Sequence, residues 1–288
     1  MIGNFYFNLK EKLHKYLGIP KYIKFSDLEI KITPDHLLKY FKKKYPTYNE
    51  FLPIISKHLD KNTIFIDVGA NCGDTLFSIF EKNKYLYFYC FEADKEFFKY
   101  LKFNKKKISK NYRVNKIKLF NELIGSEIKE ANLSGGHGTK KIDRNFNKNL
   151  PFMKSKKLDS FFRKEKKKIS FLKSDVDGFD YDILNSSLIV IKKHRPIIFF
   201  ECECSDNDNL MKYFKIIMKL KKFKYHNFVL FNNYGKFTIS TSNIGVVKKR
   251  IKDQLLNKKR KLFFDILMYT QKDKQTIINA IKEFKKID

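Results

Sequence analysis

Two glycines and two carboxylates stand where they could bind a nucleoside. An apolar run (TIFIDV) contains Asp67, Gly69 follows directly after it, and a helical pattern begins just past Gly73. Glycines let the backbone approach a ligand closely, and the N-terminus of the following helix favours polar ligand groups. The next apolar run ends at Glu92, where a carboxylate can accept both hydrogen bonds of a ribose diol. Either feature alone is typical of an ordinary turn or helix cap, but together on consecutive strands they predict a ribose-containing cofactor.

The loop sequence narrows the class of cofactor. Asn71 occupies the place of the second glycine of the dinucleotide fingerprint G-x-G-x-x-G, so that fingerprint is not met. The pattern D-x-G-x-x-x-G that is present resembles motif I of class I S-adenosylmethionine-dependent methyltransferases. In that class, residues after the third strand often contact the adenine side of the cofactor. The resemblance therefore implies that S-adenosylmethionine is bound by Asp67, Gly69, Asn71, Gly73, Glu92, Asn121 and Glu122.

Segments further along the chain resemble the FkbM-type methyltransferase family. They are an LD pair in 158–161 (LDSF), a strand and helix in 169–184 (ISFLKSDVDGFDYDIL) and a strand in 195–201 (RPIIFFE). With FIDVGANCG and CFEAD, the similarity covers about residues 60–205 in the family's order. Asp177 is a departure, because the family more often has Glu there. The resemblance implies a Rossmann-like seven-stranded sheet and O-methylation, often of sugar or polyketide hydroxyls.

Methyl transfer to an alcohol also needs a group that removes the hydroxyl proton, either a general base or a metal ion. Asp175 and Glu201 end the fourth and fifth predicted strands, so both should project at the carboxyl edge of the sheet, next to the cofactor loop. We therefore expect Asp175 to act as base or metal ligand, and a divalent ion shared by Asp175 and Glu201 is an open alternative. His137, in the glycine-rich loop SGGHGT, is the second candidate base. The plainer interpretations are that Asp175 or Asp177 caps a helix beginning near Gly178, and that His137 is a surface residue.

The elements that must position these residues alternate between strand-like and helix-like segments. Seven apolar runs predict strands, at 63–68, 85–92, 116–124, 169–175, 196–201, 225–231 and 262–270. Helical segments lie between them at 74–82, 95–104 and 207–221. This alternation predicts an α/β fold with a mostly parallel sheet covered by helices on both faces. Residues 125–157 interrupt the rhythm, and we interpret them as an insertion over the carboxyl edge that shapes a substrate site.

Composition limits the class of protein. The chain has 288 residues, 43% of them hydrophobic, and a formal net charge of +30. The abundance of Lys, Asn, Ile, Phe and Tyr is typical of coding drift in an AT-rich genome, so the charge is weak evidence for a nucleic-acid partner. Four cysteines without a CxxC pair, and no long uncharged apolar stretch, predict a reduced cytoplasmic protein. We expect three parts: a basic helical extension (1–45) that allows peripheral membrane contact, a methyltransferase domain (46–271) and a C-terminal helix (272–288).

Two other functions remain open. A ribose O-methyltransferase acting on RNA is favoured by basic runs such as 102–118, although base-methylating enzymes are excluded because the chain has neither a Pro-Pro-aromatic nor a Pro-Cys motif. A non-catalytic basic binding module is the second alternative. Our prediction is an S-adenosylmethionine-dependent O-methyltransferase acting on a hydroxyl of a sugar or glycan precursor, with no specific nucleic-acid partner. The basic surface would suit an acidic acceptor.

Overall fold

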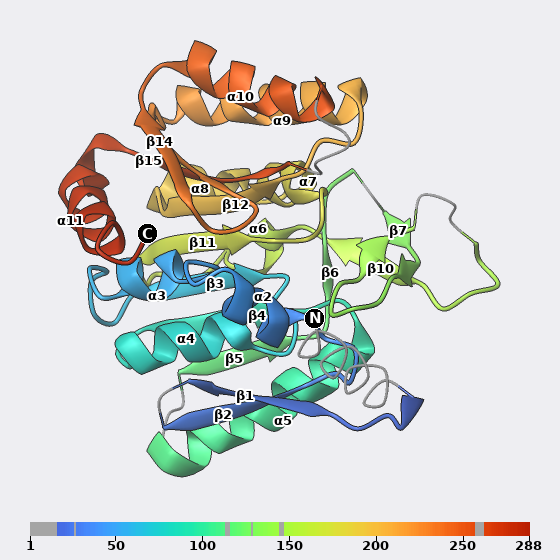
Figure 1. Cartoon of the computed structure of the whole chain (residues 1–288). Helices are drawn as coiled ribbons and strands as arrows, with labels where there is room; N and C mark the ends of the chain where they lie inside the picture. Colours follow the sequence, from blue (N-terminus) through green and yellow to red (C-terminus); the bar gives the residue numbers. More distant parts are fainter. Residues whose placement is uncertain (1–15, 26, 113–115, 128, 144–146, 257–261) are drawn as a thin grey trace, which may run out of the picture.

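A central sheet of eight strands organises the protein (Figure 1). The computed structural model describes residues 16–25, 27–112, 116–127, 129–143, 147–256 and 262–288. Five neighbouring strands run parallel, whereas β15 lies antiparallel between β12 and β13, and β14 pairs antiparallel with β13. The order across the sheet is β14 (Phe237–Thr241), β13 (Asn227–Asn232), β15 (Phe264–Tyr269), β12 (Ile197–Cys202), β11 (Ile169–Ser174), β3 (Ile64–Val68), β4 (Tyr87–Phe91), β5 (Ile117–Phe120).

The predicted α/β class and mostly parallel sheet are confirmed, with two differences in the strands. Strand β14 was not predicted: it forms a hairpin with β13 through a turn in which Gly235 has φ +78°, and its residues are only half-buried. The predicted strand 116–124 divides into β5 and β6 (Leu123–Ile124), and β6 leaves the main sheet to pair with β10 (Met153–Lys156). Asn121 and Glu122 therefore lie at a strand end rather than within a strand.

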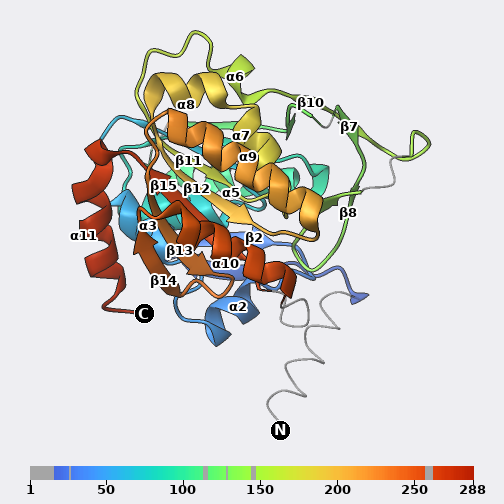
Figure 2. The same ribbon diagram turned by 90° about the horizontal axis from the view of Figure 1, so that it is seen from above.

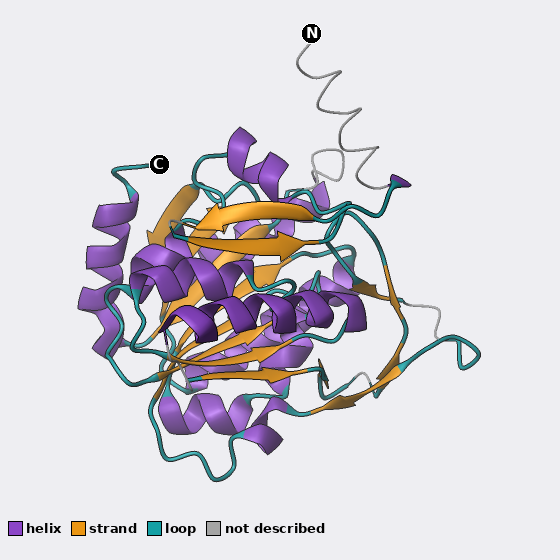
Figure 3. Cartoon of the chain, turned by 90° about the horizontal axis from the view of Figure 1, so that it is seen from below, coloured by secondary structure: helices purple, strands orange, loops and turns teal. Residues whose placement is uncertain are grey.

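Helices cover both faces of the sheet (Figure 3). All three predicted helices are confirmed, the first at Asp74–Lys82 and the other two with later C-terminal ends. One face bears α3 (Phe51–Ser56), α4 (Asp74–Lys82), α5 (Lys95–Tyr112) and α11 (Lys274–Phe284), whose buried residues share one cluster. The other bears α6 (Leu158–Phe161), α7 (Asp180–Asn185), α8 (Leu188–His194), α9 (Asn207–Lys222) and α10 (Ile244–Leu256). The short helices α2 (Leu38–Lys44) and η2 (Gln271–Asp273) lie in connections.

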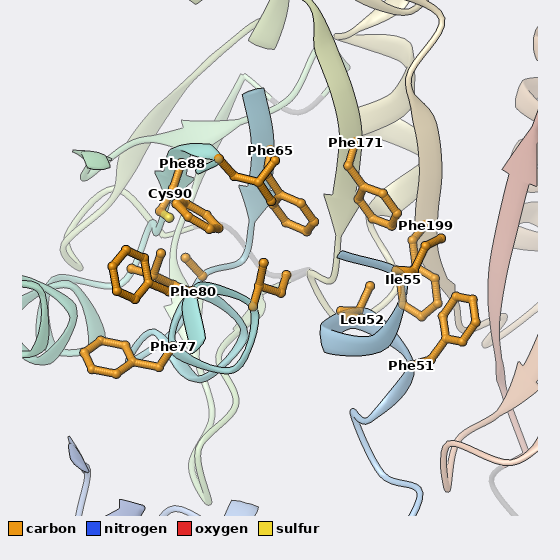
Figure 4. Close-up of a cluster of buried hydrophobic side chains, with 14 of the residues drawn as sticks. Phe51, Leu52, Ile55, Phe65, Phe77, Phe80, Phe88, Cys90, Phe171 and Phe199 are labelled. Carbon is orange, nitrogen blue, oxygen red and sulfur yellow. The ribbon is translucent and has the colours of Figure 1, made fainter. Parts of the chain in front are cut away.

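The two faces are separated by the alternation of side chains along the buried strands. Phe65 of β3 points to one face, whereas Ile64 and Ile66 point to the other. The rings of Phe65 and Phe171 are stacked, with centroids 4.7 Å apart, on the side where α3 and α4 pack (Figure 4). This cluster fixes the central strands whose carboxyl ends form the site.

Replacing Phe65 with alanine is expected to destabilise the fold by roughly 3–5 kcal/mol, because a fully buried ring is lost and a cavity remains. The free energy of unfolding, measured by urea denaturation, checks this. The matched control is Phe103→Ala, since Phe103 is 45% exposed, and we expect that variant to stay within about 1 kcal/mol of wild type. Equal losses in both variants would contradict the assignment of the core.

The N-terminal segment corrects one prediction. A basic helical extension was expected over residues 1–45, but this range contains strand β1 (Lys21–Phe25), paired antiparallel with β2 (Leu28–Ile32). Residues 1–15 lie outside the described residues. Apolar residues of β2 are fully buried in the cluster that also contains residues of α11. The domain boundaries stay a prediction, although residues from both sides of each boundary share this core.

The insertion 125–157 forms short strands beyond one end of the sheet. It contains the strands β7 (Glu130–Ala131), β8 (Leu133–Ser134), β9 (Lys141–Ile142) and β10. With β6, which directly precedes the insertion, they form the small sheets β6–β10–β7 and β8–β9. Figure 2 shows β7, β8 and β10 together on the side away from α11. The four cysteines are free and buried, as expected of reduced thiols. Within the described part of the chain, no helix has the length and apolar character needed to cross a bilayer.

Candidate functional site

Two cavities meet at the carboxyl ends of β3 and β11. Four residues line both of them, namely Gly69, Asn71, Asp175 and Asp177. The first cavity continues toward the tip of β4 and is lined by Glu92, Glu122 and apolar side chains that include Leu123, Ile124, Phe179 and Ile183. The second cavity has a volume of about 570 Å³ and continues toward the N-terminal segment and the end of β12. The insertion contributes to both, with Ile142 in the first cavity and His137 to Thr139 in the second, which agrees with its expected role in shaping a substrate site.

The loop after β3 requires its first glycine. Gly69 has φ +79°, and a Cβ atom placed on it would lie 1.9 Å from the backbone oxygen of Asp175. The loop and the end of β11 therefore touch backbone to backbone. Gly73 has φ +98° and packs against Leu101, but it is not among the described lining residues of either cavity. Its predicted contact with the cofactor is replaced by a structural role at the start of α4.

Asp67 also departs from its predicted role. Its side chain is 1% exposed and does not belong to the described lining of either cavity. The carboxylate lies 3.0 Å from the ammonium of Lys173, which also donates to the Gly69 oxygen at 3.1 Å. Burial lowers the pKa of Lys173, but Asp67 and Asp175 outweigh this and raise it, so the ammonium stays charged. Asp67 thus supports the loop through Lys173, and Lys173 but not Asp67 belongs to the described lining of the second cavity.

Asn71 connects the loop after β3 to two other segments of the chain. Its backbone is left-handed (φ +48°), a conformation that asparagine tolerates better than most residues. Its side-chain amide donates to the Gly138 oxygen at 2.7 Å, and its side-chain oxygen accepts from the Cys72 amide at 2.7 Å. Its backbone amide donates to Glu92 Oε2 at 2.7 Å. The sequence predicted a cofactor contact here; the structure adds that this residue holds the insertion, the loop and the carboxylate together.

His36 was not predicted to have a role, and it is the residue that orients Asn71. It is buried, lines the second cavity, and lies with Nε2 3.3 Å from Asn71 Oδ1. Its Nδ1 accepts the Leu38 backbone N–H, so the neutral ring carries its proton on Nε2 and donates to Asn71. Burial lowers the pKa of His36, which favours this neutral form. No sequence motif surrounds the residue, so only the packing of the N-terminal segment reveals it.

Glu92 is held with both carboxylate oxygens in the first cavity. Oε1 accepts from the Asp94 amide and Oε2 from the Asn71 amide, each at 2.7 Å. Each oxygen keeps a lone pair for a further donor, as recognition of a ribose diol requires. Burial raises the pKa of Glu92 to about 7, although the two backbone hydrogen bonds oppose this. This geometry agrees with the role predicted for Glu92.

Asn121 and Glu122, the two residues predicted to contact the cofactor after the third strand, have different positions in the structure. Asn121 donates to the backbone oxygens of Glu92 and Ala93, at 2.9 and 3.0 Å, and so positions the tip of β4 without belonging to the described cavity lining. Glu122 lines the first cavity and pairs with Lys156 at 2.7 Å. Asp182, whose role was not predicted, also lines this cavity and accepts from the backbone and hydroxyl of Ser126. That contact fixes the start of the insertion beside the cavity.

The loop after β11 places two of its aspartates in the cavities. Asp175 has a half-exposed side chain, lines both cavities and lies 3.4 Å from the Lys173 ammonium. Asp177 has φ +54°, and burial together with the Asp175 charge raises its pKa to about 6. The helix α7 begins at Asp180 after Phe179 and shows no side-chain cap within the described residues, so neither aspartate is the cap considered above. Asp180 instead accepts from Ser174 Oγ at 2.5 Å, behind the loop.

The predicted metal pair is not the group of acids that the structure brings together. Among the described residues, Asp177, Glu201 and Glu203 offer carboxylate oxygens that lie within 4.8 Å of one another, and Asp175 is outside this group. Asp175 directly follows β11, whereas Glu203 directly follows β12 and lies two residues past Glu201. His137 lines the second cavity with an exposed side chain and a left-handed backbone (φ +61°). Its role as a base stays a prediction.

Comparison with known proteins identifies the family. Residues 67–230 match the Methyltransferase FkbM domain, which is more than half of the chain. Among solved structures, the chain is 12% identical to methyltransferase FkbM from Methylobacillus flagellatus KT, with a TM-score of 0.46 over 73% of this chain and 44% of that one. It therefore spans less than half of that protein's length.

Two other solved structures are similar at a comparable level. The METTL16 MTase domain is 14% identical, with a TM-score of 0.42 over 84% of this chain and 74% of that one. The plantazolicin methyltransferase BpumL in complex with SAH is 8% identical, with a TM-score of 0.40 over 81% and 88%. No curated protein matches the chain. The family match, together with the glycine loop and the Glu92 carboxylate, establishes that the chain belongs to the FkbM methyltransferase domain family, a class of S-adenosylmethionine-dependent enzymes.

Proposed function

We propose that the protein transfers a methyl group from S-adenosylmethionine to a hydroxyl of a sugar or glycan precursor. The observation that carries this proposal is that two cavities share Gly69, Asn71, Asp175 and Asp177. Methyl transfer from a sulfonium is an in-line displacement, so the protein must mainly align donor and acceptor across a common wall. A donor in the first cavity would present its methyl group at this junction, and an acceptor in the second cavity would meet it there.

The first cavity has the groups that an adenosyl ligand needs. Glu92 would accept the ribose hydroxyls, and the apolar side chains around Ile124 and Phe179 would pack against the adenine ring. Gly69 and Asn71 of the loop line this cavity, and the methionine end would lie against them. Because the Asn71 amide already donates to Glu92, the carboxylate is oriented before the donor binds.

Asp175 is the residue placed to remove the acceptor proton. It lines both cavities, and its half-exposed carboxylate leaves an oxygen accessible to an acceptor hydroxyl. The buried ammonium of Lys173 lies 3.4 Å from one of its carboxylate oxygens and holds that side of the group. His36 does not compete for this role, since its Nε2 proton is directed at Asn71 and its Nδ1 lone pair is used by Leu38.

The second cavity favours a polyhydroxylated acceptor over an RNA. Its described lining includes five carboxylates and only two lysines, one of which is bound to Asp67, so a phosphate backbone would meet negative charge there. Carboxylates accept hydrogen bonds from sugar hydroxyls, and Phe41, Tyr48 and Phe263 offer ring surfaces beside them. An acidic group on the acceptor, as the net charge of +30 suggests, would have to remain outside the cavity on the basic surface.

Replacing Asp175 with asparagine is expected to lower kcat roughly 100- to 10,000-fold while leaving the affinity for S-adenosylmethionine within about threefold of wild type. The physical reason is that the amide keeps the shape of the side chain but cannot accept the proton. S-adenosylhomocysteine formation is measured with a panel of nucleotide-linked sugars, free glycans and short RNAs, and calorimetry gives the donor affinity.

The control for this variant is Asp208→Asn, which removes an exposed carboxylate on α9 and should leave kcat unchanged. Methyl transfer to an RNA ribose, with none to any sugar in the panel, would replace the proposed acceptor class. Full activity in Asp175→Asn would remove this residue as the base and turn attention to His137.

A further inference from the structure

Three carboxylates converge at one side of the second cavity. Glu201 is on β12, Glu203 lies two residues beyond it, and Asp177 comes from the loop after β11. One carboxylate oxygen of each lies within 4.8 Å of the other two. Oxygen ligands about 2.0–2.6 Å from a divalent ion lie at most roughly 4–5 Å from one another, so the three side chains are close enough to share one ion.

Glu201 supplies an independent indication that a cation belongs here. The residue is only 7% exposed and lines the cavity, and its Oε2 atom is buried without a hydrogen-bond partner among the described residues. A buried carboxylate oxygen without a partner is costly, and proteins normally compensate it with a cation or a donor. The other oxygens of the group are more accessible, because the side chains of Asp177 and Glu203 are 23% and 36% exposed.

Lysine neutralises this group only in part. Lys141 of β9 lies 2.7 Å from Glu203 Oε2 and 3.7 Å from Asp177 Oδ1, so it contacts two of the three carboxylates. Lys173, the other lysine of the described cavity lining, is held by Asp67, Asp175 and the Gly69 oxygen. With all three carboxylates ionised around a bound ion, one ammonium would leave two negative charges, which a divalent cation would balance.

We propose that Asp177, Glu201 and Glu203 bind one divalent cation that prefers oxygen ligands, such as Mg²⁺ or Mn²⁺, and that the ion displaces the ammonium of Lys141. Carboxylate ligands select hard cations of this kind. The displacement also connects the ion to the insertion, because Lys141 is in β9 and its neighbour Lys140 lines the first cavity. Cation binding would therefore change the contacts that hold the insertion over both cavities.

The position of the ion gives it a use in the reaction, a step that rests on the proposed function. An acceptor hydroxyl coordinated by the ion would lose its proton more readily, and Asp175 would accept that proton and pass it to water. The new C–O bond forms as the S–CH₃ bond breaks, and that electron pair stays on sulfur, giving the neutral thioether. No oxidant or reductant is consumed. The ion would thus assist a carboxylate that is by itself a weak base for an alcohol.

The test measures Mn²⁺ binding directly, without donor or acceptor. The purified full chain is titrated with Mn²⁺, and free Mn²⁺ is followed by its electron paramagnetic resonance signal. We expect one site in the wild type and roughly hundredfold weaker binding in Glu201→Gln and Glu203→Gln, since each variant loses a ligand. Lys141→Met should bind Mn²⁺ several-fold more tightly, because it removes a competing cation whose side chain is 46% exposed. The control Glu81→Gln, on the surface of α4, should bind like the wild type.

Several outcomes would overturn the proposal. They are the absence of Mn²⁺ binding in the wild type and unchanged Mn²⁺ binding in Glu201→Gln. Weaker or equal binding in Lys141→Met would refute the part of the proposal in which the ion displaces the Lys141 ammonium. Circular dichroism checks that each variant is folded. If a carboxylate variant does not fold, the comparison of Lys141→Met with the wild type still tests the proposal. Because this measurement involves no methyl transfer, a protein that binds Mn²⁺ but methylates no sugar would refute the proposed acceptor and leave the metal site standing.

Discussion

Alanine at position 69 is expected to abolish the binding of S-adenosylmethionine and to lower the free energy of unfolding by more than about 3 kcal/mol. Backbone strain and a steric clash both contribute to this loss of stability. The residue has φ +79°, where a Cβ atom costs roughly 1–2 kcal/mol, and that atom would lie 1.9 Å from the backbone oxygen of Asp175. Neither backbone can give way cheaply, because the Asp175 amide is bonded to the Val68 oxygen. Calorimetric titration with the donor and urea denaturation measure the two effects.

The control variant Gly18→Ala separates the cost of backbone strain from the cost of the steric clash. Gly18 also has a left-handed backbone, at φ +62°, but an added Cβ there meets nothing within 4 Å. Gly18→Ala should therefore show the strain alone, roughly 1–2 kcal/mol, with donor affinity unchanged. If Gly69→Ala bound the donor as well as Gly18→Ala does, the close contact between the loop and the end of β11 would be wrong.

Glutamine at position 92 is expected to weaken donor binding roughly ten- to hundredfold at pH 8. Both oxygens of Glu92 already accept a backbone amide, and the glutamine side chain can replace only one of those acceptors. It also loses the charge that strengthens hydrogen bonds from the ribose hydroxyls. Calorimetric titration with S-adenosylmethionine measures the change. The control is Glu81→Gln on α4, a carboxylate that belongs to the described lining of neither cavity, and it should change the affinity less than about threefold.

The pH dependence of donor binding should identify Glu92 as the residue responsible. Its pKa in the free protein is about 7 because of burial, and hydroxyl donors to the carboxylate would lower it in the complex. Binding therefore releases a proton below pH 7, so the dissociation constant rises as pH falls, by up to about tenfold per pH unit, and is flat above pH 8.

Glu92→Gln should lose this slope. If the pH dependence is present in the wild type and absent in Glu92→Gln, it cannot arise from titration of the ligand's own amino group, because both proteins bind the same ligand. A slope that persists in the variant would assign the proton to another residue. The same raised pKa makes the free protein more stable at low pH, since the stability present below the unfolded pKa is lost as pH rises through about 7.

Local patterns were enough to predict the order of elements and most of the donor cavity. The apolar runs that become β3, β4, β11 and β12 are buried on both faces, so they stand out as continuous hydrophobic segments. The glycine loop and Glu92 could be identified because a strand end, a tight turn and a helix start each depend on neighbouring residues. In contrast, β14 has half-buried residues and a weak alternation, and β1 lies in a segment whose charges and aromatic residues also fit a helix.

Tertiary structure decided which of the predicted residues face the ligand cavities. Asp67 and Gly73 belong to the motif, yet one is buried against Lys173 and the other packs on Leu101, because the loop turns its backbone rather than these groups toward the cavity. His36 and Lys141 come from segments far apart in the chain, and nothing in their local sequence indicates that they meet Asn71 and Glu203.

The sequence by itself determined the α/β architecture, the family and the Glu92 carboxylate of the first cavity, because each depends on periodicity and on motifs confined to short stretches of chain. Long-range packing determined three other features. They are the acidic lining of the second cavity, the presence of Asp177 and Glu203 in place of Asp175 in the candidate metal group, and the hydrogen bonds of Asn71. Those contacts are set by where the N-terminal segment and the insertion come to lie, and a linear pattern carries no such information.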